Sequence, residues 1–295
     1  MRRAAACIGA AVFGLAAASA AFGAETPRIR FFLTAGAGFP GGSSSYTFQY
    51  DPHPGYIPAG SYAGQTLAIE PATGFDLQAG FLIPFGRIVG LRASFGWSKS
   101  SLGGENGPYE MLFKYTYYSY LPPWDSILSS HFESTDWFPT FGSLRQASIG
   151  LDLYVRWPVS KSFDVALQAG PRLIIASGQV GGLGYTEYMG SSHGAQFFRD
   201  YILTLTLPSK IKFGWSVGLE AGLRLCSCLS LLLRAGFTAG GTYEAVPELE
   251  TAGYYSGLTP IDEADFEELR DALDLPALTL PLRRFSLALG LAFAL

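Results

Sequence analysis

Charged side chains are scarce in this chain. They make up 15% of its 295 residues, whereas an ordinary soluble domain carries roughly 25%. The formal net charge is −4, and a chain without a basic excess lacks the electrostatic footprint that nucleic acid binding requires. We therefore expect no nucleic acid partner. We also expect that part of the protein surface is not in contact with water.

Cysteine and histidine are also few, with three of each. Cys7 lies in an N-terminal segment that we expect to be removed, so Cys226 and Cys228 remain. A disulfide between residues this close would be strained, and no third or fourth metal ligand lies nearby in the sequence. We interpret the pair as small turn residues and expect neither a metal nor any other cofactor.

A long apolar run, as a membrane-spanning helix needs, is missing after the first 23 residues. Residues 1–23 have the pattern of a signal peptide, because Arg2 and Arg3 precede an apolar segment, 4–15, and a run of small residues. We expect this segment to be cleaved and residues 24–295 to form one domain.

Strict alternation of large apolar residues with small or polar ones is what the sequence has in abundance. In 285–295 every odd position is Phe or Leu, and every even position is Ser, Ala or Gly. A period of two is typical of an extended strand with one apolar face. The pattern recurs in seven earlier segments, at 28–38, 73–83, 88–99, 146–157, 163–177, 212–225 and 229–238. Within the segment 163–177, Pro171 predicts a bulge or an edge.

Two regularities of these segments predict a closed barrel in a membrane. No apolar face carries a charge in the central part of a segment, as expected where such a charge would cost about 2–4 kcal/mol in lipid. The connections alternate between long and short, with the long ones at 39–72, 100–142, 178–208 and 241–281. The predicted fold class is all-β: a closed antiparallel eight-stranded transmembrane β-barrel with four long extracellular loops and three short periplasmic turns.

Two other folds fit part of the pattern. A soluble β-sandwich would place the apolar faces in its core, but its outer faces would need more Lys and Glu than these Gly- and Ala-rich faces contain. A ten-stranded barrel would add 108–120 and 127–139 as a membrane pair. The segment 129–134 has no clean apolar face, and Pro122 with Pro123 indicates a hairpin tip outside the membrane. Eight strands therefore fit better than ten.

The whole pattern resembles the small eight-stranded outer-membrane barrels, the group that contains OmpX, OmpW and the membrane domain of OmpA. The resemblance lies in architecture and not in a motif. Phe285 and Phe293 are similar to the terminal aromatic signal that those barrels use for assembly, although Leu295 departs from their usual final Phe or Trp. The resemblance implies a monomer in the outer membrane of a diderm bacterium, surrounded by outer-membrane lipid and inserted by the barrel-assembly machinery.

Charged residues on the polar faces are candidates for function inside the barrel. An eight-stranded lumen is just wide enough for side chains to fill it. Charged groups there must therefore pair with one another or form hydrogen bonds with bound water. We expect a salt-bridge network that holds the barrel closed, and the alternative is a narrow gated pore whose charges exchange partners. The predicted network contains Asp76, Arg92, Asp152, Arg156, Asp164, Glu220, Arg224 and Arg234.

Aromatic residues concentrate in the second long loop, where alternation from Met111 to Tyr117 predicts a hairpin that continues the sheet. Tyr and Trp give large contact area at low entropy cost, which suits a binding surface; packing of the loops into a cap is the alternative. In the fourth loop, Thr259 is the expected N-cap of an amphipathic helix that ends near Leu273. The candidate binding residues are Tyr115, Tyr117, Tyr118, Tyr120, Trp124 and Trp137.

These features predict a non-enzymatic surface protein whose long, aromatic-rich loops contact an extracellular ligand. Barrel proteases of the omptin type need an Asp/His pair at the outer rim, and the one Asp-x-His sequence here, at Asp51 and His53, lies in a Pro-rich loop. The alternative function is a narrow or lateral-exit channel for small or hydrophobic solutes, as the resemblance to OmpW-like proteins implies.

Overall fold

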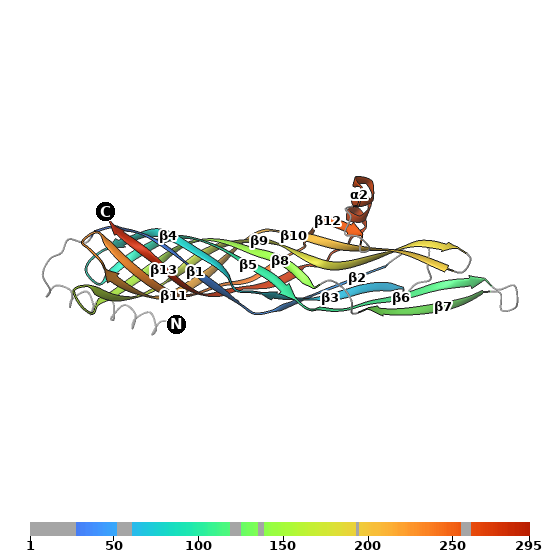
Figure 1. Cartoon of the computed structure of the whole chain (residues 1–295), viewed down its shortest axis with the longest axis horizontal. Helices are drawn as coiled ribbons and strands as arrows, with labels where there is room; N and C mark the ends of the chain where they lie inside the picture. Colours follow the sequence, from blue (N-terminus) through green and yellow to red (C-terminus); the bar gives the residue numbers. More distant parts are fainter. Residues whose placement is uncertain (1–27, 52–60, 119–124, 135–138, 193–194, 255–260) are drawn as a thin grey trace, which may run out of the picture.

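The computed structural model describes residues 28–51, 61–118, 125–134, 139–192, 195–254 and 261–295. Within these residues the chain forms a long, twisted tube of antiparallel strands with one short helix on its side (Figure 1). The described part contains no helix that is long and apolar enough to cross a membrane. The predicted signal peptide lies outside the described residues and stays a prediction.

Eight strands of the described chain pair in a closed ring, each antiparallel to both neighbours. The order around the ring is β1, β13, β11, β10, β9, β8, β5 and β4, and β4 pairs again with β1. The predicted eight-stranded antiparallel barrel is confirmed, because each of the eight alternating segments lies in a different ring strand. The ring strands are β1 (Arg30–Gly41), β4 (Gly74–Pro84), β5 (Val89–Gly104), β8 (Thr140–Pro158), β9 (Phe163–Ser192), β10 (Ala195–Arg224), β11 (Leu229–Ala245) and β13 (Leu278–Ala294).

The outer wall of the ring is apolar and exposed near the short turns. In β13, Leu287, Leu289 and Leu291 are 47%, 58% and 37% exposed, whereas Ala288 and Ala292 point inward and are buried. A soluble sandwich would bury such leucines between two sheets. An exposed apolar wall around a closed ring is what a lipid bilayer requires. The ring is therefore a transmembrane barrel of the outer-membrane type, as predicted.

On the side of the long loops the sheet continues far beyond this apolar wall. β9 and β10 each run for 30 residues, whereas about 9–11 residues are enough to cross a bilayer. We call this part the extension; it comprises the described residues of 44–71, 105–134, 178–209 and 242–280. Its additional strands are β2 (Ser44–Tyr50), β3 (Tyr62–Pro71), β6 (Asn106–Tyr118), β7 (Asp125–Ser134) and β12 (Glu248–Tyr254).

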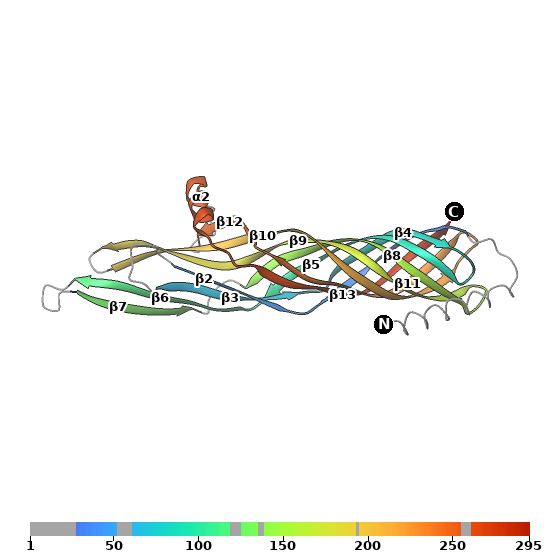
Figure 2. The same cartoon turned by 180° about the vertical axis from the view of Figure 1, so that it is seen from behind.

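The extension has two arms, which Figure 1 and Figure 2 show from opposite sides. One arm contains β2, β3, β6 and β7, and the other contains β9, β10 and β12 with the helix α2. β6 and β7 pair with each other, and β6 joins β3. The hairpin predicted in the second loop is confirmed. Since neither of its strands joins the ring, the ten-stranded alternative is excluded.

An apolar core fills the interior of the extension. Side chains from both arms and from the upper ends of the ring strands pack together and are nearly inaccessible to solvent, which is the expected state of a folded domain interior. The long loops therefore fold as structured sheet over the barrel mouth. The core includes Tyr46, Phe48, Leu67, Ile69, Leu144, Ile174, Leu183, Leu203, Leu205 and Tyr243.

Irregular backbone gathers where the ring strands pass into the extension. β10 shifts its register against β9 between Leu207 and Lys210. At a similar level Gly104 and Gly142 have positive φ angles of 145° and 152°, and a Cβ atom at either position would lie 2.1 Å from a backbone oxygen of the neighbouring strand. Glycine is required at such close approaches.

The prediction of a bulge or an edge at Pro171 is wrong. β9 runs through this residue, which pairs with Trp215 of β10 without a shift in register. On the other side, the ladder to β8 has a gap between the pairs Gly150↔Arg172 and Leu153↔Ala169 and then resumes in the same register. Proline removes only its own N–H donor, and the pairing that continues on both sides keeps the strand straight.

The helix α2 (Glu263–Ala272) begins later than predicted. Its N-cap is Asp262, whose Oδ1 accepts a hydrogen bond from the backbone N–H of Asp265 at 2.9 Å. Asp is at least as good a cap as Thr, and Thr259 lies outside the described residues. Leu269 is buried in the core of the extension and Phe266 packs against it, so the predicted amphipathic character is confirmed.

Candidate functional site

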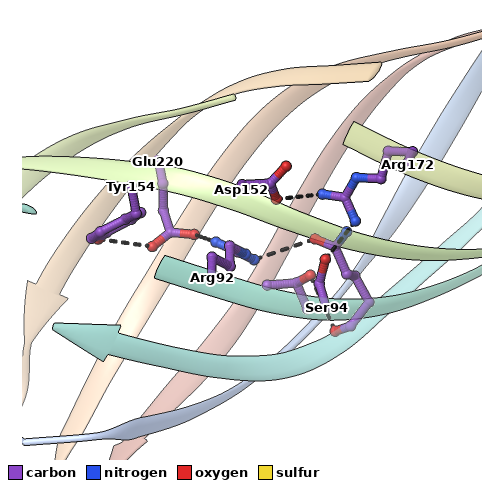
Figure 3. Close-up of polar contacts among 8 residues, drawn as sticks. Arg92, Ser94, Asp152, Tyr154, Arg172 and Glu220 are labelled. Carbon is purple, nitrogen blue, oxygen red and sulfur yellow. Dashed lines mark hydrogen bonds and ion pairs between the residues drawn. The ribbon is translucent and has the colours of Figure 1, made fainter. Parts of the chain in front are cut away.

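Two buried ion pairs lie in the middle of the lumen (Figure 3). Arg92 of β5 binds Glu220 of β10. Arg172 of β9 binds Asp152 of β8, with 2.6 Å between Nη2 and Oδ2. The four side chains are between 0% and 2% exposed. Charges buried this deeply have to be paired and hydrogen-bonded.

Neutral side chains complete the surroundings of the pair between Arg92 and Glu220. The hydroxyl of Tyr154 donates to Oε1 of Glu220 at 3.4 Å, and Nη2 of Arg92 donates to Oε1 of Gln78 at 3.3 Å. The guanidinium carbon of Arg92 lies 3.7 Å from the centre of the Phe32 ring, a cation–π contact. The pair is thus enclosed by one hydroxyl, one amide and one aromatic ring.

The second pair is held by two serines. Ser216 donates its hydroxyl to Oδ1 of Asp152 at 2.8 Å and accepts a hydrogen bond from Nε of Arg172 at 2.9 Å. Nη1 of Arg172 donates to the hydroxyl of Ser94. These contacts fix both oxygens of Asp152 and the Nε, Nη1 and Nη2 atoms of Arg172, so the pair is tightly positioned.

The ion pairs do not follow the strand register. Arg92 lies directly opposite Asp152 in the ladder between β5 and β8, and Glu220 lies directly opposite Arg234 between β10 and β11. Nevertheless Arg92 binds Glu220, although β8 and β9 separate their strands around the ring. The pair therefore joins two distant walls of the barrel across its lumen.

Three of the other predicted charges lie near the periplasmic turns, and two are buried in the lumen. Near the periplasmic turns, Arg156 donates to Asp164 with 2.8 Å between Nε and Oδ2, and both side chains are partly exposed. Arg224 is also partly exposed there, at the end of β10. Asp76 is buried in the lumen and 4% exposed. Arg234 is only 4% exposed and has no ion pair with any described residue.

Two partners are missing from the predicted network. Arg172 binds Asp152, and Arg284 binds Asp76 with 3.1 Å between Nη2 and Oδ1. Arg172 alternates with Leu173 in phase with the polar face, so the pattern contained its signal. Arg284 immediately precedes the expected last strand, and β13 begins earlier, at Leu278. Extending the alternation backwards would have placed Arg284 on the inner face.

Apolar layers lie on both sides of the lumen charges. We call these charges the charged belt, which comprises Asp76, Arg92, Asp152, Arg172, Glu220, Arg234 and Arg284. Below it, toward the short turns, Phe32, Leu82 and Leu232 pack in one buried cluster with Tyr154. Above it, Leu144, Ile174 and Leu282 belong to the core that continues into the extension. Within the described residues, the buried charges of the barrel therefore lie between two apolar clusters.

A groove lies on the outer face of the first arm of the extension. It has a volume of about 230 Å³. Because Phe48 and Gln65 are buried while their neighbours in sequence are not, the alternation turns the other lining residues outward. The hydroxyls of two lining residues, Thr47 and Thr66, are hydrogen-bonded at 3.0 Å. The outward lining residues are Thr47, Gln49, Tyr62, Gly64, Thr66 and Glu110.

Tyrosine side chains connect the two arms of the extension. The hydroxyl of Tyr50 is 3.0 Å from that of Tyr109 and also donates to the carbonyl of Thr186 at 3.2 Å. The ring of Tyr50 stacks on Tyr185 with 4.4 Å between centres. Burial raises the pKa of Tyr50 well above its usual value and that of Tyr109 to about 12. Both hydroxyls therefore stay protonated, and they link β2 and β6 to β9.

The candidate binding residues of the second loop are placed only in part. Tyr115, Tyr117 and Tyr118 lie in β6 by their backbone. Tyr120, Trp124 and Trp137 lie outside the described residues, so the proposed aromatic surface stays a prediction.

At the opposite end of the molecule, Cys226 and Cys228 are exposed thiols in the turn between β10 and β11, with 3.3 Å between their Sγ atoms.

No protein-family model and no curated protein matches the sequence. Similar solved structures include a major outer membrane protein from Thermus thermophilus, with 16% identity, 90% of this chain and 99% of that chain covered, and a TM-score of 0.40. The outer membrane protein OprG from Pseudomonas aeruginosa is 11% identical over 91% of this chain and 97% of its own, with a TM-score of 0.39.

A third similar structure corrects one expectation. The outer membrane protease OmpT from Escherichia coli is 11% identical over 94% of this chain and 100% of its own, with a TM-score of 0.36. Outer-membrane barrels therefore include enzymes, and the prediction that this chain is not an enzyme is contradicted. The reason is physical: a barrel is a scaffold, and chemistry depends on side chains at its rim, not on the sheet.

Proposed function

We propose that this chain is a surface protein of the outer membrane whose extension binds a glycan in the groove on β2, β3 and β6. The observation that carries the proposal is the extension itself, which is a folded, two-armed sheet and not a set of short loops. A rigid scaffold of this size outside the membrane has a role in contact with the exterior, because it adds nothing to closure of the ring.

The chemistry of the groove favours a ligand rich in hydroxyl groups. Each sugar hydroxyl both donates and accepts, so it pairs with amides, carboxylates and other hydroxyls. Gln49, Glu110 and the two threonines supply these groups. The ring of Tyr62 offers an apolar face for the C–H side of a sugar. A mostly apolar ligand would leave these polar groups unpaired.

Binding to glycans tests the proposal. We expect the refolded protein in detergent to be retained on an array of immobilised neutral and acidic oligosaccharides. Glu110→Gln should weaken that binding about tenfold or more, because a hydrogen bond to a charged group contributes about 1.5–3 kcal/mol. Tyr62→Ala should weaken it as well, because the stacking surface is lost.

The matched control is Thr251→Ala, an exposed position on β12 of the other arm. It should bind as the parent does. If the parent binds no oligosaccharide on the array, or if the Glu110 and Tyr62 variants bind as tightly as the parent, the groove is not a glycan site.

A channel for small solutes is the second candidate function. The observation in its favour is the belt of charges in the lumen, whose ion pairs could exchange partners. Against it stand the two apolar layers of the interior. An ion that passes Leu144 and Ile174 or Phe32 and Leu82 would lose its water without gaining a partner.

We therefore expect the purified protein to show no reproducible conductance steps in planar bilayers at neutral pH. The measurement should compare the parent with Ile174→Ala, which opens the upper apolar layer without changing any charge. Regular steps from the parent protein would overturn the closed-lumen interpretation and favour the channel.

A further inference from the structure

The charged belt of the lumen contains one positive charge in excess. Its arginines are Arg92, Arg172, Arg234 and Arg284, and its acids are Asp76, Asp152 and Glu220. Each acid is used by one of the other three arginines. Arg234 is the remaining cation, and it is 4% exposed. A buried charge without a counterion is strongly unfavourable.

Unpartnered polar atoms gather around this arginine. Nε of Arg234 and both amide atoms of Gln168 are buried and have no hydrogen-bond partner among the described residues. The Gln168 side chain is 1% exposed. Unmade hydrogen bonds of this kind are rare in folded proteins and each costs about 1–3 kcal/mol. Two such side chains on nearby strands indicate that a small ligand binds between them.

Glycines on adjacent strands make room at this place. Gly218 of β10 lies opposite both Gln168 of β9 and Gly236 of β11. A Cβ at Gly218 would lie 2.6 Å from Nε2 of Gln168, and a Cβ at Gly236 would lie 3.3 Å from Nη2 of Arg234. The same Cβ at Gly236 would lie 3.3 Å from the hydroxyl oxygen of Ser286. The three polar groups thus share the space above two neighbouring glycines.

We propose that the lumen binds a small monovalent anion of the halide class, such as chloride, between Arg234, Gln168 and Ser286. A guanidinium, an amide NH₂ and a hydroxyl are all hydrogen-bond donors. The Ser286 hydroxyl donates only a long hydrogen bond, 3.5 Å, to the carbonyl of Gly236, and it would turn to the anion instead. A single negative charge balances the belt, whereas a divalent anion would create a new imbalance. The site lies between the two apolar layers, so it is independent of the glycan proposed for the outer groove.

The test begins with folding, so that the ion is present when the charged belt becomes buried. The protein is refolded into detergent in sodium chloride, sodium bromide or sodium gluconate at equal ionic strength. At a halide concentration about 100 times Kd, the unfolding equilibrium constant should be about 100-fold smaller than in gluconate. Crystals of the bromide-refolded protein should show an anomalous peak beside Arg234.

Two variants separate this site from a general salt effect. Arg234→Met should lose the halide dependence, while Arg224→Met, which removes one arginine from the partly exposed lower layer, should keep it. The bromide map of the parent decides the question even if Arg234→Met fails to fold. Absence of the anomalous peak, or stability that is equal in halide and gluconate, would overturn the proposal.

Discussion

Replacing Glu220 with alanine should lower the free energy of unfolding by about 3–5 kcal/mol, the cost of removing one partner from a buried ion pair. Arg92 would then be left 0% exposed without a carboxylate. The hydrogen bond from Tyr154 to Glu220 would be lost as well. The measurement is the urea unfolding midpoint of the refolded barrel in detergent, with the slope checked to be unchanged.

Two control variants define what this loss means. Glu105→Ala removes an exposed carboxylate at the end of β5 and should change stability by no more than about 0.5 kcal/mol. Replacing Arg92 with Met and Glu220 with Leu together should restore much of the loss, because an apolar pair leaves no charge unpaired. A Glu220→Ala variant as stable as the parent would show that the ion pair does not hold the walls of the barrel together.

The strands of the barrel could be predicted from the sequence because lipid and lumen impose opposite requirements on neighbouring residues. Leu289 faces outward and is 58% exposed, while Ala288 faces inward and is 4% exposed. This difference repeats along every ring strand with a period of two, and it is therefore visible without any knowledge of the neighbouring strands. The number of strands follows from the same pattern, and the alternation of long and short connections indicates how consecutive strands are joined.

Alternation predicted the hairpin of β6 and β7 in the extension, but the part of β9 in the extension could not be predicted in the same way. From Gly181 to Thr186, β9 is buried at every position, because the other arm covers its second face. A strand buried on both sides has no reason to alternate. Its pairing with residues as distant as Tyr50 and Gln65 depends on contacts between arms, and such contacts leave no local period in the sequence.

The partners of the ion pairs in the lumen could not be predicted from the sequence either. Alternation places Arg92 and Asp152 at the same depth on neighbouring strands, and they are indeed opposite one another. Each nevertheless binds a different partner, because a long arginine reaches across a narrow lumen as easily as to the next strand. Depth can be counted along a strand, but the direction in which a side chain extends within a shared interior is decided by packing.

Placing an arginine at Leu289 should destabilise the folded barrel in a bilayer by about 2–4 kcal/mol, because the charge would face lipid near the middle of the membrane. Leu289 is opposite Ala35 on one side and Leu233 on the other, and both neighbours are exposed on the same outer wall. The measurement is reversible unfolding from lipid vesicles, with Leu289→Ala to account for the lost apolar surface.

The matched control for this variant is Val246→Arg. Val246 is 56% exposed, almost the same as Leu289, but it lies between β11 and β12 in the extension, where the surrounding solvent is water. An arginine there should change stability by no more than about 0.5 kcal/mol. Exposure alone does not distinguish the two positions, so a large difference between them measures the solvent on each side of the boundary. Equal effects at both positions would mean that the apolar wall of β13 does not face lipid.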